Sequence, residues 1–169
     1  MSEIETVWAK LASRATRVVL ARKDVSYDGL MEALASNGIA AQPRSVVSRI
    51  SRGTLRLSLF LQIVSVTGAR MPERWSSAVR VADTWEQRAR AVCEAELARQ
   101  PTENIEDFAE RLRRLGTAVS QRALSTQINN GIISLSLFLQ LLYLLNADSL
   151  DRFLDPEDII AAAMARTNA

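Results

Sequence analysis

Histidine is absent from this chain of 169 residues, and cysteine occurs once, at Cys93. A zinc site uses about four nitrogen or sulfur ligands, or three and a water molecule, so the usual zinc sites are excluded. A disulfide within the chain is impossible, which is typical of proteins from a reducing compartment. The commonest general acid–base group is missing, and the sequence has neither a glycine-rich phosphate loop nor a nucleophile motif. We therefore expect no enzyme activity, no metal and no cofactor.

Glycine and proline are also scarce. Six glycines and four prolines interrupt a chain in which 48% of the residues are hydrophobic. This balance favours helices around a substantial core over many short strands. Residues 1–5 are acidic and lack the apolar run of a secretory signal, and the most apolar stretch, 132–145, is shorter than the roughly 20 residues that cross a bilayer. The sequence thus predicts an all-α, cytoplasmic protein without membrane contact.

An internal repeat organises the chain. The string Leu-Ser-Leu-Phe-Leu-Gln at Leu57–Gln62 recurs 78 residues later at Leu135–Gln140, and the same shift pairs Gly53 with Gly131. A match of this length predicts a duplicated module. We expect a first, basic module at 1–68, a linker at 69–82, a second, acidic and divergent module at 83–147, and a C-terminal helical segment at 148–169.

Each module should contain four helices. In the second module the first helix is predicted to begin at Asp83, with Glu86 completing a capping box. The third helix of the first module is short, because Pro43 suits a first helical turn and Gly53 a helix end. Its polar face should be exposed, whereas the fourth helix, 58–67, is almost entirely apolar and should be central. A short polar helix beside an apolar one is the layout of a recognition helix.

Charge is distributed unevenly. Residues 1–82 carry 12 Lys and Arg against 6 Asp and Glu, whereas residues 83–169 carry 9 against 13, so the net charges are +6 and −4. This asymmetry indicates that the first half faces a polyanion and the second half does not.

The run Val-Ser-Arg-Ile-Ser-Arg-Gly at Val47–Gly53, followed by an apolar helix, resembles the recognition-helix region of the lambda-repressor-like helix-turn-helix family, here as a tandem duplication. The whole module also resembles a bacterial domain family of uncharacterised function. The segment from Gly38 to Arg44 is longer than the tight turn of the repressor family. The resemblance implies that bases are contacted early on the third helix and phosphates later. The implied base-contacting residues are Arg44, Ser45, Ser48 and Arg49, and the implied phosphate-contacting residues are Arg52 and Arg56.

The second module offers a second candidate DNA-binding set, and two interpretations of it stay open. Glutamine and asparagine can pair with adenine, so this module could contact DNA as well. Alternatively its positive face has been lost, and the module serves as a scaffold or dimerisation surface, which its acid excess favours. The second set consists of Gln121, Arg122, Thr126, Gln127 and Asn130.

Together these patterns predict a sequence-specific DNA-binding transcriptional regulator, a repressor, that binds double-stranded DNA with the short helix 43–52. The chain acts either as a built-in pseudo-dimer or as a homodimer formed through its acidic module. No small-molecule ligand is expected. The alternative is a protein-interaction adaptor that keeps the helical fold without binding DNA.

Overall fold

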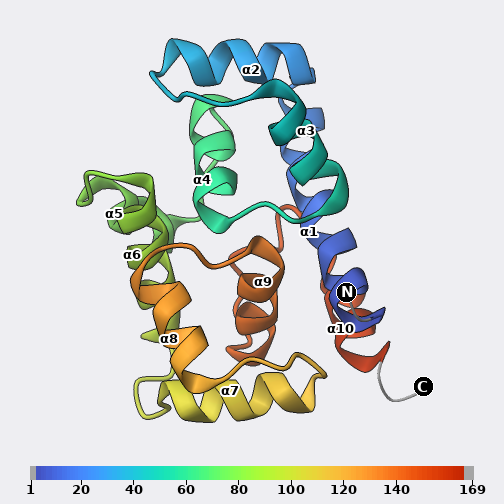
Figure 1. Ribbon diagram of the computed structural model, residues 1–169, viewed down its shortest axis with the longest axis vertical. Coiled ribbons are helices and arrows are strands. Elements are labelled where there is room, and N and C mark those ends of the chain that lie inside the picture. The colour runs from blue at the N-terminus through green and yellow to red at the C-terminus, as the bar shows by residue number, and fades with distance from the viewer. Residues whose placement is uncertain (1–2, 166–169) are drawn as a thin grey trace.

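The computed structural model describes residues 3–165, and within that span the protein is entirely helical (Figure 1). The all-α class predicted from the sequence is therefore confirmed. The helices are α1 Glu3–Arg22, α2 Tyr27–Ser36, α3 Pro43–Arg52, α4 Leu57–Val66, α5 Glu73–Arg80, α6 Trp85–Leu97, α7 Ile105–Arg114, α8 Gln121–Asn129, α9 Leu135–Leu144 and α10 Pro156–Met164.

Local chemistry sets the helix boundaries. Pro43 occupies the first turn of α3, where its missing N–H costs nothing, and Gly53 ends the helix in the left-handed conformation, with φ at +68°. The capping box predicted at Asp83 is wrong by one residue. The Thr84 side chain accepts a hydrogen bond from the Gln87 amide, and the Gln87 side chain accepts one from the Thr84 amide. The Gln87 side chain also accepts a hydrogen bond from the Asp83 amide, so one glutamine satisfies two backbone donors when Thr84 is the cap.

The two halves repeat one close contact between their first and third helices. A Cβ on Gly53 would lie 1.7 Å from the carbonyl oxygen of Ala9 on α1, and a Cβ on Gly131 would lie 1.9 Å from that of Glu86 on α6. Both glycines also have positive φ. Only glycine can occupy such a position, so the duplication has retained the residue that lets α3 and α8 dock. The predicted tandem repeat is confirmed.

The halves exchange partners across a common core. Helix α1 packs on α9 of the second half, and α6 packs on α4 of the first half. Two ring contacts repeat this exchange, because the ring centroid of Trp75 lies 5.6 Å from that of Phe138, and that of Phe153 lies 6.0 Å from that of Phe60. Each half thus covers the apolar fourth helix of the other, and a single hydrophobic cluster runs through both halves.

A local two-fold axis relates the halves where the loops before α4 and α9 meet. The Leu57 amide donates to the Ile133 carbonyl, and the Leu135 amide donates to the Leu55 carbonyl, both at 2.9 Å. The repeat shift of the sequence exchanges these two hydrogen bonds, as a two-fold axis requires. In architecture, one chain therefore corresponds to a dimer whose subunits have been joined covalently.

The remaining segments close the sides of this core. Segment 69–82, predicted as a linker, contains α5, which packs along α6. In the segment that follows the second module, α10 packs on α1 and α9, and Arg14 forms an ion pair with Asp158. Residues 166–169 of the predicted C-terminal segment lie outside the described residues. Across residues 3–165, no helix combines the length and apolar character needed to cross a membrane.

Candidate nucleic-acid interface

Helix α3 is anchored through one apolar stripe and exposes most of its remaining surface. Val46 and Ile50, one turn apart, are buried, and the helix packs on α1. The structure gathers the first predicted contact set on the outer side of α3 and on the loop that follows it. In this set Arg44, Arg49, Arg52 and Arg56 are exposed, and Ser45 and Ser48 are partly exposed.

These arginines keep their charge available. Helix α3 contains no acidic residue, and among the described residues no carboxylate forms an ion pair with the arginines of this set. The second half is different, because most of its arginines are paired. Ion pairs to Glu or Asp engage Arg90, Arg99, Arg111, Arg113 and Arg114. The outer surface of α3 thus gathers unpaired positive charge that an external polyanion could contact.

Two members of the predicted set bind each other. The Arg52 guanidinium donates to the Ser48 carbonyl at 3.4 Å through Nε, and to the Ser48 hydroxyl through a second nitrogen. This contact spans one helical turn and lies on the exposed side. Ser48 therefore positions Arg52 along the helix, whereas Arg44 and Arg49 extend from other positions on the same helix.

Arg56 occupies a central place between the two halves. It precedes α4 and faces Ser134 in an isolated antiparallel bridge, the point through which the local two-fold axis passes. Its side chain is exposed. Arg56 thus lies between α3 and α8, and not on α3 itself, so a duplex that lies across both helices would pass over it.

The connection between α2 and α3 differs from that of a usual helix-turn-helix unit. Residues 37–42 separate α2 from α3, and the equivalent residues 115–120 separate α7 from α8, so each connection has six residues. The usual unit has a turn of about three or four residues. The long connection expected from the spacing of Gly38 and Arg44 is confirmed. Helix α2 packs on α4, and α3 is held mainly by α1.

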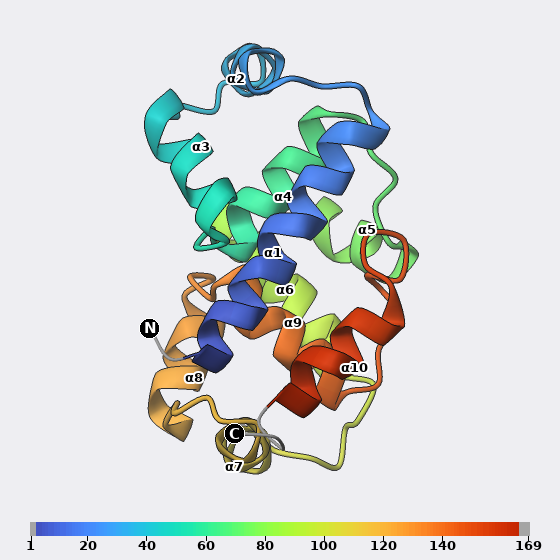
Figure 2. The same ribbon diagram turned by 90° about the vertical axis from the view of Figure 1, so that its right-hand side faces the viewer.

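The second candidate set occupies α8, the structural equivalent of α3. Figure 2 shows α3 and α8 along the same edge of the molecule, with α5 and α10 along the opposite edge. Leu124 and Ile128 bury one stripe of α8 and leave the polar residues outside. Within this set Gln121, Arg122, Thr126 and Asn130 are exposed, and Gln127 is partly exposed.

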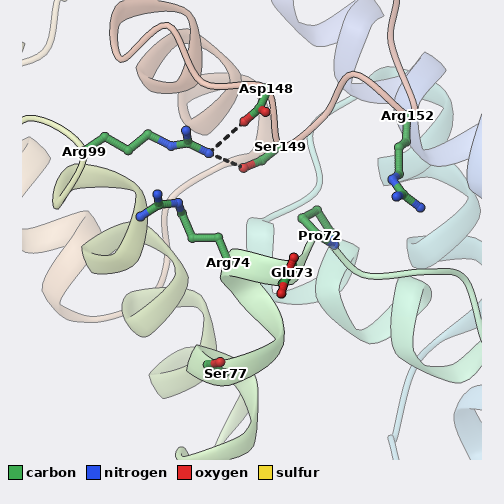
Figure 3. Close-up of a pocket in the computed structure, with 8 residues that line it drawn as sticks. All are labelled: Pro72, Glu73, Arg74, Ser77, Arg99, Asp148, Ser149 and Arg152. Atoms are coloured by element: carbon green, nitrogen blue, oxygen red, sulfur yellow. Dashed lines mark hydrogen bonds and ion pairs between the residues drawn. The ribbon is translucent and has the colours of Figure 1, made fainter.

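A cavity of about 610 Å³ opens where α5, the end of α6 and the chain after α9 meet (Figure 3). The guanidinium groups of Arg74 and Arg99 lie on the same side of it. Arg99 donates to the Asp148 carboxylate at 3.0 Å and to the Ser149 hydroxyl at 3.1 Å. Because Arg99 directly follows α6, these two hydrogen bonds connect α6 to the chain after α9. We call this group of contacts beside the cavity the junction.

A buried carboxylate completes this junction. Glu96 is 1% exposed and accepts hydrogen bonds from Trp75 Nε1 at 2.6 Å, from Arg99 Nε at 2.5 Å and from the Ser149 hydroxyl. These donors satisfy oxygens that burial would otherwise leave unpaired. Burial opposes the charged form of Arg99. The hydrogen bonds of Arg99 to Glu96 and Asp148, and its attraction to these two carboxylates, nevertheless raise the pKa of Arg99. The junction therefore stabilises the interlocked halves.

Cys93 lies on the same buried face of α6. It is 1% exposed, and burial, with the negative charges of Glu94 and Glu96, raises the pKa of its thiol far above neutrality. The thiol is thus protonated and unreactive at neutral pH. Glu96 follows Cys93 by three residues and so lies on the same apolar face of the helix. An acidic residue at such a position is the sequence feature that could have indicated the buried junction. Within residues 3–165, no group of three or more cysteine and acidic side chains is placed to hold a metal ion.

The fold is that of a duplicated, all-helical protein whose halves interlock around one core and whose first half displays a basic third helix. The chain belongs to the family described as a domain of unknown function (DUF6471), whose model matches residues 8–71 and again residues 85–150. This double match confirms both the duplication and the predicted resemblance to a family of uncharacterised function. No curated protein and no solved structure shows a significant match to the chain.

Proposed function

We propose that the chain is a cytoplasmic, sequence-specific DNA-binding regulator of transcription that uses α3 as its recognition helix. One observation carries the proposal: an exposed helix without acidic residues holds three arginines, with a fourth in the next loop, and no carboxylate within residues 3–165 forms an ion pair with them. The resemblance of Val47–Gly53 to the lambda-repressor-like helix-turn-helix family supports the same assignment.

The chemistry of α3 divides into base and phosphate contacts. Arg44 and Arg49 contact base edges in the major groove, where a guanidinium can bond guanine O6 and N7 together. Arg52 and Arg56 bind phosphates, which fixes the position of the protein but carries no sequence information. Repression is the simplest action of such a protein, because occupancy of the duplex is sufficient to exclude other proteins from the same site.

A protein-interaction adaptor is the second candidate function. The acidic second half, with its net charge of −4, favours it, because phosphate contacts dominate the affinity of DNA-binding proteins. The two functions are separated by purification under native conditions. An adaptor would retain a stoichiometric protein partner and no nucleic acid, whereas a DNA-binding protein would retain nucleic acid and show a raised ratio of absorbance at 260 nm to that at 280 nm.

The double variant Arg44→Ala with Arg49→Ala is expected to bind its duplex site about 100-fold more weakly than the wild type, since each lost base contact costs about 1–3 kcal/mol. Fluorescence anisotropy with a labelled duplex, selected by the wild-type chain, measures the change. The matched control is Arg70→Ala with Arg80→Ala, which removes the same charge from exposed positions outside α3 and α8. Equal affinities for the wild type and the α3 variant would show that α3 is not the recognition helix.

A further inference from the structure

The equivalent position of α3 and α8 has a consequence for the kind of DNA site. The reciprocal hydrogen bonds between Leu57 and Ile133 and between Leu135 and Leu55 place a two-fold axis between the halves. The matched contacts of Gly53 and Gly131 dock α3 and α8 in the same way on α1 and α6. A two-fold-related pair of helices on one edge is the arrangement with which dimeric helix-turn-helix proteins bind two half-sites of a duplex.

We infer that one chain binds one duplex through α3 and α8 together, at an imperfect inverted repeat whose two half-sites differ in sequence. This inference rests on the proposed function and adds the second helix, the stoichiometry and the asymmetry of the site. The halves share one hydrophobic core, so the separation of the two helices is fixed by the fold and no second copy is needed to set it.

The side chains explain why the half-sites differ. Arg122 on α8 is the counterpart of Arg44, but Gln127 stands where α3 has Arg49, and Asn130 where α3 has Arg52. Arginine favours guanine, and the amides of glutamine and asparagine pair with the N6 and N7 atoms of adenine. The half-site under α3 is therefore rich in guanine contacts, and the half-site under α8 combines a guanine contact of Arg122 with an adenine contact of Gln127. Asn130 takes the phosphate-facing position of Arg52 without its charge.

Charge also divides unequally between the two half-sites. Beside the first residue of α8, Glu106, Asp107, Glu110 and Arg113 line a concavity together with Gln121, and Arg113 forms an ion pair with Glu110. The two remaining carboxylates, Glu106 and Asp107, repel phosphates near α8, so it contributes base contacts and few phosphate contacts. The dependence of affinity on salt accordingly originates in α3 and Arg56, although both helices contribute to sequence preference.

The experiment compares the wild-type chain with Arg122→Ala/Gln127→Ala on the duplex that the wild type selects from a random pool. The matched control, Ser77→Ala/Arg80→Ala on α5, removes one charge and one small polar group from exposed positions on the opposite edge. Sedimentation of each complex gives its stoichiometry, and hydroxyl-radical footprinting gives the protected positions. Circular dichroism melting of the free variants shows that they are folded.

We expect one chain per duplex, with two protected patches on one face of the duplex about 34 Å apart. The α8 variant should bind about 10- to 50-fold more weakly, lose protection at one half-site only and keep the wild-type salt slope. Two chains per duplex, or an α8 variant with wild-type affinity and footprint, would overturn the inference and leave α3 as the recognition helix. If the wild type selects no duplex, the proposed function itself fails, and the inference fails with it.

Discussion

Neither half of the chain is expected to fold alone when residues 1–82 and 83–169 are produced as separate polypeptides. Helix α4 of the first half would no longer be covered by α6 and Phe153. Helix α9 of the second half would no longer be covered by α1 and Trp75. Exposure of several fully buried side chains on each fourth helix costs on the order of 10 kcal/mol. This is comparable with the entire stability of a small domain, which is about 5–15 kcal/mol.

Circular dichroism and thermal melting of the two fragments measure this effect. Each fragment should show little helix and no cooperative transition, and an equimolar mixture should recover the helix content and the melting transition of the intact chain. The intact chain is the control. A fragment that melts cooperatively by itself would mean that the halves are independent domains, contrary to the exchanged packing of α1 and α6.

Gly53→Ala is expected to destabilise the chain by about 3–5 kcal/mol, because it combines left-handed strain with a collision between backbones. The new Cβ would lie 1.7 Å from the carbonyl oxygen of Ala9, and neither α1 nor α3 can shift without opening the core. Gly131→Ala should have a similar effect, because its Cβ would lie 1.9 Å from the Glu86 carbonyl oxygen. Urea unfolding measured by circular dichroism gives the change in the free energy of unfolding.

Gly38→Ala is the matched control for this prediction. Gly38 has a φ of +71°, close to that of Gly53, but no atom lies within 4 Å of an added Cβ. It should therefore cost only the left-handed strain, about 1–2 kcal/mol. If Gly53→Ala and Gly38→Ala destabilise the chain equally, close docking of α3 on α1 contributes nothing, and the account of how α3 is positioned is wrong.

The sequence is sufficient to predict most of the local structure. The repeated Leu-Ser-Leu-Phe-Leu-Gln string reveals the duplication, and Pro43 and Gly53 give the bounds of α3, because proline and glycine act on the backbone where they stand. Burial of Val46 and Ile50 follows from their spacing of four residues. The exposure of Arg44 and Arg49 follows in turn, since these side chains lie off that stripe.

The exchange between halves could not be predicted from the same patterns. An apolar stripe shows that a helix is buried but not which helix covers it, and the near-identical α4 and α9 offer equivalent surfaces to α1. The hydrogen-bond partners of Glu96 could not be predicted for a similar reason, because Trp75 and Ser149 are distant from it in the sequence. The common edge of α3 and α8 depends on this exchange, so it too emerges only in three dimensions.

The most direct test of the central claim is selection of duplexes from a random pool by the purified chain, followed by measurement of affinity as a function of salt. The claim that α3 presents arginines to DNA predicts an enriched sequence motif. It also predicts that log K falls with log salt concentration at a slope of about −2, since Arg52 and Arg56 bind phosphates and each phosphate contact contributes about −0.9. A pool that emerges without an enriched sequence, together with a slope near zero, would contradict the claim.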